Sequence, residues 1–119
     1  MTKANRRSIR IPIARVARWL RGDRVLMCEA RDLNEHGLFL RTTERTPPNR
    51  LMRIELELPG RTVTFLGVAR FLGETASGVG IGVEIFSMHP ADKQAWLTFY
   101  RSMLDRAVRI APVAVASAG

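Results

Sequence analysis

The sequence predicts a mainly β protein, a small six-stranded antiparallel β-barrel with one C-terminal α-helix. Through most of the chain, short segments with apolar residues at every second position are separated by turns that contain Gly, Pro or Asn, as in small antiparallel barrels. After Pro90 the apolar residues recur at three- and four-residue steps instead, which indicates a helix. The 119 residues suffice for one domain with one core.

The segment 11–20 fits both a helix and a strand by the spacing of its apolar side chains. Pro12 disfavours a helix through this point, because it lacks an N–H donor and its ring obstructs the preceding turn. The segments that follow have β character, so we predict a strand here as well. A turn at Arg21-Gly22-Asp23 ends this strand.

Five further segments are predicted to be strands. The clearest is 52–58, where Met, Ile and Leu alternate with Arg and Glu, so that one face is buried and the other is wet. Gly67 interrupts a longer apolar segment and indicates a bulge or a bend. The predicted strands span residues 24–31, 38–40, 52–58, 62–72 and 79–85.

The predicted helix begins near Pro90, which suits a first helical turn, and Asp92 lies where negative charge stabilises a helix N-terminus. We expect its apolar stripe to cover an open end of the barrel or, alternatively, to form a dimer face. The chain then divides into a flexible basic arm at 1–10, the barrel with its helix at 11–110 and a disordered tail at 111–119. The stripe consists of Trp96, Phe99, Tyr100, Met103, Ala107 and Val108.

The net charge of +8 is concentrated near the N-terminus. Residues 1–24 hold eight Lys or Arg side chains against one acid, Asp23, whereas the other 95 residues together carry +1. A basic field of this kind favours an anionic partner, such as a nucleotide, a nucleic acid or an acidic protein surface. The alternative is a solvated basic face that only aids solubility.

Other classes of function find little support in the sequence. Cys28 is the only cysteine, which excludes an internal disulfide and fits a reducing compartment. We see neither an apolar run of membrane-spanning length nor a signal peptide, and we expect a cytoplasmic protein. His36 and His89 lack further metal ligands, and no catalytic or phosphate-cradling motif is present. We therefore expect no metal, no cofactor and no catalysis.

Two short motifs carry the candidate binding chemistry. Arg6-Arg7-Ser8-Ile9-Arg10 places three guanidinium groups within five residues. An arginine fork matches the O6 and N7 acceptors of guanine, and it also stacks on purines and pairs with phosphate. Asp32-Leu33-Asn34-Glu35-His36-Gly37 follows a predicted strand and has the composition of a turn. Its carboxylate can accept hydrogen bonds from the N1–H and N2–H groups of guanine.

These motifs, in this order and within strands that a helix follows, resemble the PilZ domain, a bacterial receptor for the second messenger cyclic di-GMP. The family pattern is Arg-x-x-x-Arg, a gap, and then Asp/Asn-x-Ser-x-x-Gly. Arg6 and Arg10 match the first element, and Asp32 and Gly37 match the ends of the second. Asn34 stands where the family has serine.

The resemblance covers roughly residues 5–105 and implies a six-stranded barrel with a C-terminal helix, as the alternation does. The segment Gly80-Ile81-Gly82-Val83-Glu84-Ile85-Phe86 is similar to the glycine-rich last strand of the family. We expect the arginines to bind guanine edges and phosphates, and the final glycine of the turn to adopt positive φ. The ligand-binding residues that the resemblance implies are Arg6, Arg7, Arg10, Asp32, Asn34 and Gly37.

Three functions remain in competition. In the first, cyclic di-GMP orders the basic arm, and the reshaped surface engages a separate protein partner in the control of motility, exopolysaccharide synthesis or biofilm formation. In the second, a ligand-free adaptor of the same fold docks its basic arm on an acidic partner. In the third, the barrel binds nucleic acid. The aromatic content of only 7%, mainly in core-like positions, argues against this third function.

Overall fold

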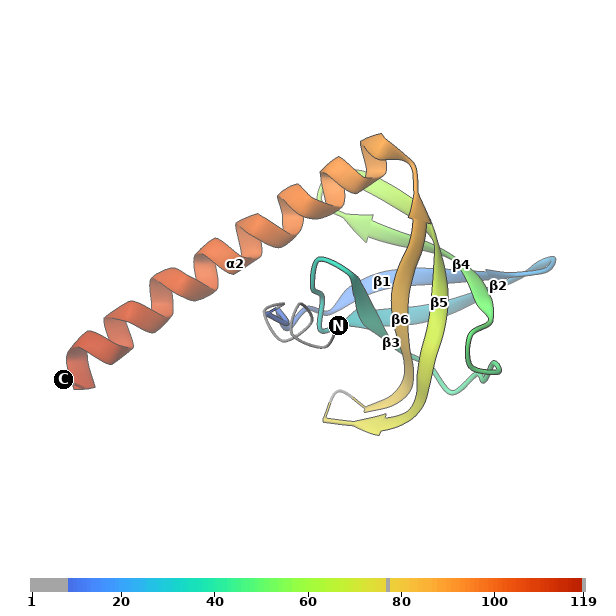
Figure 1. The fold of residues 1–119 in the computed structure, drawn as a ribbon, viewed down its shortest axis with the longest axis horizontal. Helices are drawn as coiled ribbons and strands as arrows, with labels where there is room; N and C mark the ends of the chain where they lie inside the picture. Colours follow the sequence, from blue (N-terminus) through green and yellow to red (C-terminus); the bar gives the residue numbers. More distant parts are fainter. Residues whose placement is uncertain (1–8, 77, 119) are drawn as a thin grey trace.

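The computed structural model describes residues 9–76 and 78–118 and confirms the predicted fold class, a closed six-stranded antiparallel barrel with a C-terminal helix (Figure 1). Around the barrel the strands lie in the order β1-β2-β3-β6-β5-β4. The elements are β1 (Arg15–Arg21), β2 (Arg24–Arg31), β3 (Gly37–Arg41), β4 (Leu51–Leu58), β5 (Arg61–Thr75), β6 (Gly78–Met88) and α2 (Pro90–Ala118).

Residues 15–20 of the ambiguous segment 11–20 form a strand, as predicted, whereas residues 12–14 lie outside it and Ile11 forms only an isolated bridge. β1 pairs along its whole length with β2 and, from Ala17 to Leu20, with β4. A two-residue turn joins β1 to β2, and its Gly22 adopts a φ of 64°, which costs glycine little. The second pairing of β1 closes the sheet into a barrel.

β5 and β6 form a longer hairpin than the sequence predicted, since β5 ends at Thr75 and β6 begins at Gly78. The register shifts between Leu66 and Gly67, so the predicted irregularity at Gly67 is confirmed. It shifts again between Ala69 and Phe71, where Arg70 is the extra residue. This second irregularity shapes the outer surface described below.

The barrel interior is filled by inward-facing apolar side chains, and the first half of α2 covers one end of it. Trp96 and Tyr100 are only 1% and 4% exposed, which places these two members of the predicted stripe in the core. The indole of Trp96 packs edge-on against Phe65 of β5, with ring centroids 5.5 Å apart. The helix is therefore part of the same core as the barrel.

α2 is longer than the sequence predicted, and it includes residues 111–118 of the segment 111–119 for which we predicted a disordered tail. The helix continues through Ala118, and its C-terminal part extends away from the barrel (Figure 1). Four of residues 111–118 are alanine, the residue with the highest helix propensity, and Pro112 does not end the helix.

Asp92 fastens the N-terminus of α2 to β5. Its Oδ1 accepts hydrogen bonds from Arg61 Nη2 at 2.7 Å and Nε at 3.2 Å, and its Oδ2 accepts one from the Thr64 backbone N–H at 3.1 Å. The Arg61 side chain, with help from the Thr64 N–H, lowers the pKa of Asp92. The helix is thus attached to the barrel by a charged contact as well as by packing.

We expect Asp92→Asn to lower the free energy of unfolding by about 1 kcal/mol at pH 7, because the uncharged amide loses the ion pair and offers a weaker acceptor to Thr64. The pKa of Asp92 is lower in the folded than in the unfolded protein. Its contribution is therefore present above the ordinary aspartate pKa of about 3.9 and is lost as the pH falls through the folded-state value. Urea denaturation between pH 7 and pH 2 measures the free energy of unfolding of the wild type and of Asp92→Asn. A difference between the two proteins that stays constant with pH would contradict this role of Asp92.

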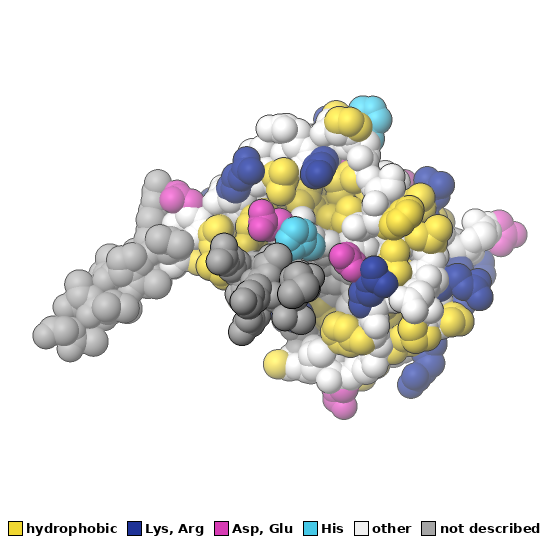
Figure 2. All heavy atoms as spheres, in the orientation of Figure 1, with side chains coloured by type: hydrophobic (Ala, Val, Ile, Leu, Met, Phe, Trp, Pro, Cys, Tyr) yellow, Lys and Arg dark blue, Asp and Glu magenta, His cyan; other side chains and the backbone are white. Residues whose placement is uncertain are grey.

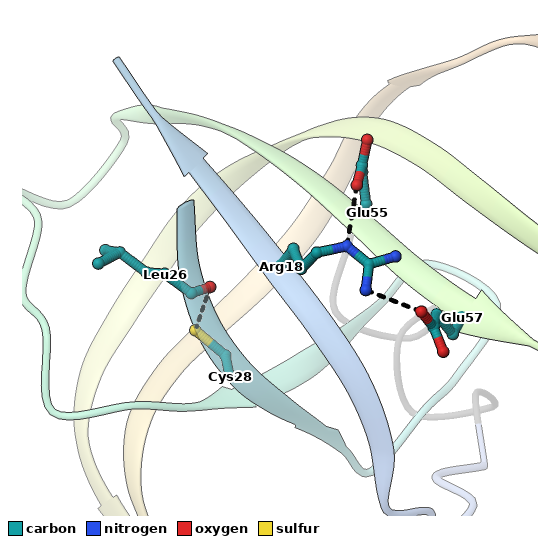
Figure 3. Close-up of polar contacts among 5 residues, drawn as sticks. All are labelled: Arg18, Leu26, Cys28, Glu55 and Glu57. Atoms are coloured by element: carbon teal, nitrogen blue, oxygen red, sulfur yellow. Dashed lines mark hydrogen bonds and ion pairs between the residues drawn. The ribbon is translucent and has the colours of Figure 1, made fainter. Parts of the chain in front are cut away.

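The basic charge of the described residues is dispersed over the barrel. On the face shown in Figure 2, Lys and Arg side chains are separated by acidic, polar and hydrophobic ones. Part of the basic charge is also paired with acidic side chains of the barrel. Arg18 on β1 donates from Nε to Glu55 at 3.0 Å and from Nη1 to Glu57 at 2.8 Å (Figure 3). A helix with the length and hydropathy of a membrane span is not found among residues 9–76 and 78–118.

Candidate functional site

The two sequence motifs meet at an isolated backbone bridge between Ile11 and Leu33. The Ile11 N–H donates to the Leu33 carbonyl at 2.7 Å, and the Leu33 N–H donates to the Ile11 carbonyl at 2.9 Å. Both side chains are buried in the core, which holds the bridge in place. The residues just before and just after the bridge therefore lie side by side, although more than twenty positions separate them in the sequence.

Asn34 builds the turn that leads from this bridge into β3. Its Oδ1 accepts hydrogen bonds from the backbone N–H groups of His36 at 2.7 Å and Gly37 at 2.9 Å, and its own N–H donates to the Gly37 carbonyl at 3.0 Å. This use of the side-chain oxygen is typical of Asx turns, and a serine hydroxyl forms the same kind of turn more weakly. The structure thus gives Asn34 a structural role that the sequence prediction, a polar ligand contact, did not include.

We expect Asn34→Ala to lower the free energy of unfolding by roughly 1–2 kcal/mol, because two backbone N–H groups lose their acceptor. Asn34→Ser should lose clearly less free energy of unfolding, since the serine hydroxyl oxygen can replace Oδ1 as the acceptor. Chemical denaturation of the wild type and the two variants measures these differences. Equal losses in the serine and alanine variants would contradict the role of Asn34 in the turn.

Gly37 is needed for a different reason from the one predicted. The expected positive φ is wrong, because the φ of Gly37 lies outside the left-handed region. A Cβ at this position would instead lie 2.0 Å from the backbone carbonyl oxygen of Val83 on β6. The positive φ of this motif belongs to Asp32, at 51°, a conformation that Asp adopts more readily than most residues. Gly37 therefore permits the close approach of β3 and β6.

An open cavity of about 230 Å³ lies beside this turn, on the outer face of β3, β6 and β5. It brings together side chains from the arm, from the turn and from the β5–β6 hairpin. Arg6 and Arg7, which were also predicted to bind a ligand, lie outside the described residues. The predicted residues that line the cavity are Arg10, Asp32, Asn34 and Gly37.

The aromatic floor of the cavity was not predicted. Phe71 is 41% exposed and stacks with Phe39 of β3, with ring centroids 6.2 Å apart. Gly82 of β6 pairs with both residues, and a Cβ there would lie 2.1 Å from the Phe71 ring. Strict alternation from Ala69 would turn Phe71 inward, but the extra residue in β5 turns it out.

A polar wall next to the ring was also missed by the sequence analysis. Arg70 donates from Nε to Glu84 Oε1 at 2.6 Å and from Nη1 to Asn49 Oδ1 at 2.9 Å. Both Arg70 and Glu84 line the cavity, and their side chains are about half exposed. No short motif marks them, because the pairing of β5 with β6 brings them together.

The cavity thus combines guanidinium groups, carboxylates and an exposed aromatic face. This set can stack on a planar base, accept hydrogen bonds from its N–H groups and neutralise phosphate. A metal site finds no support, since the described residues contain no group of three or more His, Cys, Asp or Glu side chains suited to a metal ion. The arrangement fits non-covalent recognition of an anionic ligand that carries a base.

Comparisons with known proteins give the same fold. The family model of the PilZ domain matches residues 4–102, whereas no curated protein matches the chain. The Bacillus subtilis inhibitor of motility, MotI/DgrA, has a similar structure, with a TM-score of 0.69 and 12% identity over 87% of this chain and 51% of its own. The PilZ domain of Escherichia coli YcgR, solved with c-di-GMP, has a TM-score of 0.65 and 13% identity over 89% of this chain and 96% of its own. The chain therefore spans about half the length of MotI/DgrA and nearly all of the YcgR domain.

Proposed function

The chain belongs to the PilZ domain family, and from this we propose that it is a receptor for cyclic di-GMP that signals to a separate protein partner. The observation that carries the proposal is the convergence of the arm and the turn at the Ile11–Leu33 bridge, beside a cavity lined by Arg10 and Asp32. The structure of the YcgR domain with c-di-GMP supports it as well.

The proposed ligand contacts follow from the chemistry of each group. The Arg10 fork would engage a guanine edge or a phosphate, with Arg6 and Arg7 supplying further positive charge. Asp32 would accept hydrogen bonds from guanine N1–H and N2–H, and the Asn34 amide nitrogen would donate to the ligand. The exposed Phe71 ring offers a stacking surface for a base.

In this proposal the protein is cytoplasmic and acts by binding, without catalysis. Ordering of the basic arm around the ligand would change the surface that a partner meets. Motility, exopolysaccharide synthesis and biofilm formation are the candidate processes, and motility is the process named for MotI/DgrA.

One observation favours the alternative, a ligand-free adaptor for an acidic partner. An open groove of about 730 Å³ runs between α2 and the barrel, with an apolar floor and arginines along it. Arg15 lies over the Phe99 ring, with its guanidinium carbon 5.9 Å from the ring centroid, and both residues line this groove. The groove is lined in part by Ile13, Arg15, Leu58, Phe99, Met103 and Arg106.

Isothermal titration calorimetry with cyclic di-GMP distinguishes the two functions, and cyclic di-AMP is the control for recognition of guanine. We expect saturable binding of cyclic di-GMP and much weaker binding of cyclic di-AMP, whose adenines lack the N1–H and N2–H donors. Asp32→Asn should weaken binding without altering the fold, because asparagine also tolerates the left-handed conformation. The absence of cyclic di-GMP binding would overturn the proposed receptor function and leave the ligand-free adaptor as the remaining function.

A further inference from the structure

One face of α2 is hydrogen-bonded to both halves of the candidate site. Trp96 Nε1 donates to the backbone carbonyl of Asn34 at 3.0 Å, and the Tyr100 hydroxyl donates to the backbone carbonyl of Ile9 at 2.8 Å. The two side chains are four residues apart, so they lie on the same face of the helix. The helix therefore contacts both the arm and the turn, through two residues that do not themselves line the cavity.

Both donors of these hydrogen bonds are buried, so the loss of either acceptor would destabilise the protein. Trp96 and Tyr100 are 1% and 4% exposed, and a buried donor without an acceptor is costly. The ordinary tyrosine pKa of about 10 already keeps the Tyr100 hydroxyl a protonated donor at neutral pH, and burial raises this pKa further. Ile9 directly precedes Arg10, and Asn34 lies in the turn between Asp32 and Gly37. Each hydrogen bond thus fixes the backbone next to a residue that lines the cavity.

We propose that Trp96 and Tyr100 are positioning residues for the cyclic di-GMP site, with α2 holding Arg10 and the turn at the separation that the ligand requires. This inference rests on the proposed function. Because coupling between sites is reciprocal, a ligand that joins the two segments also strengthens the attachment of α2 to them.

Two variants test the inference, and only Tyr100→Phe leaves the packing nearly unchanged, because Trp96→Phe also removes part of a buried ring. Tyr100→Phe removes only the hydroxyl, and Trp96→Phe removes the indole donor. Ile54→Val is the control, because Ile54 is fully buried in the barrel and does not line the cavity. The first measurement is amide hydrogen exchange without ligand at Ile11 and Leu33, which report on the bridge between arm and turn. The second is the affinity for cyclic di-GMP by calorimetry.

We expect Tyr100→Phe to speed exchange at Ile11, and Trp96→Phe at Leu33, by about fivefold relative to amides of β4, the equivalent of one lost hydrogen bond. Both variants should bind cyclic di-GMP about fivefold more weakly, whereas Ile54→Val should retain its affinity. In the wild type, the ligand should slow exchange of the Trp96 indole N–H, which a merely structural tryptophan would not show.

The outcomes separate this inference from the proposed function. If the wild type binds no cyclic di-GMP, the proposed function fails, and faster exchange at the bridge in the variants still supports the attachment by α2. If the wild type binds and the variants bind equally well, the positioning role is overturned. Unchanged exchange at Ile11 and Leu33 in both variants would overturn it whether or not the ligand binds.

Discussion

Gly37→Val is expected to lose at least about 3 kcal/mol of unfolding free energy, the upper part of the range for overpacked sites. The added Cβ would meet the Val83 carbonyl oxygen at 2.0 Å, and a backbone atom of a paired strand cannot move aside as a side chain can. β3 and β6 would have to separate where they pair at Gly37 and Glu84. Since domains of this size are stable by only about 5–15 kcal/mol, this loss is large.

Thermal unfolding followed by circular dichroism measures the effect, and we expect a drop in melting temperature of about 10 °C or more. Ala76→Val is the control, because Ala76 is exposed in the turn between β5 and β6. A Gly37→Val protein that melts like the wild type would contradict the close approach of β3 and β6.

Much of the barrel could be predicted because each strand shows its pattern locally. The alternation at 52–58 reflects a wet face and a buried face, and it matches β4 closely. The predicted irregularity at Gly67 was also local, since a glycine inside an apolar strand weakens regular pairing. Where the strands end was less predictable, because the β5–β6 hairpin is extended by pairing between the two strands.

The candidate site depends more on long-range contacts, which local patterns do not contain. Phe71 faces outward only because Arg70 is an extra residue relative to β6, and that register is set by pairing across the sheet. The hydrogen bond from Tyr100 to Ile9 joins residues 91 positions apart. By contrast, the role of Asn34 in the turn could have been predicted, because Asx turns have a local sequence signature.

Arg10 is the predicted ligand residue that is best suited to a test of binding alone. Its side chain is exposed and lines the cavity, and it makes no hydrogen bond or ion pair with the described residues. The following residue, Ile11, is buried and bonded to Leu33, so the backbone at Arg10 is fixed without the guanidinium. Removal of this side chain should therefore change binding and leave the fold intact.

Arg10→Ala is expected to weaken cyclic di-GMP binding more than tenfold, the equivalent of about 1.5–3 kcal/mol for a lost charge-assisted contact, with an unchanged melting temperature. Arg10→Lys should recover only part of the affinity, because an ammonium group keeps the charge but cannot form the planar fork. Arg53→Ala is the matched control, since Arg53 is also exposed, on β4, but does not line the cavity. Calorimetry measures the four affinities. If Arg10→Ala binds like the wild type, or if Arg53→Ala loses as much, the ligand does not bind at this cavity through Arg10.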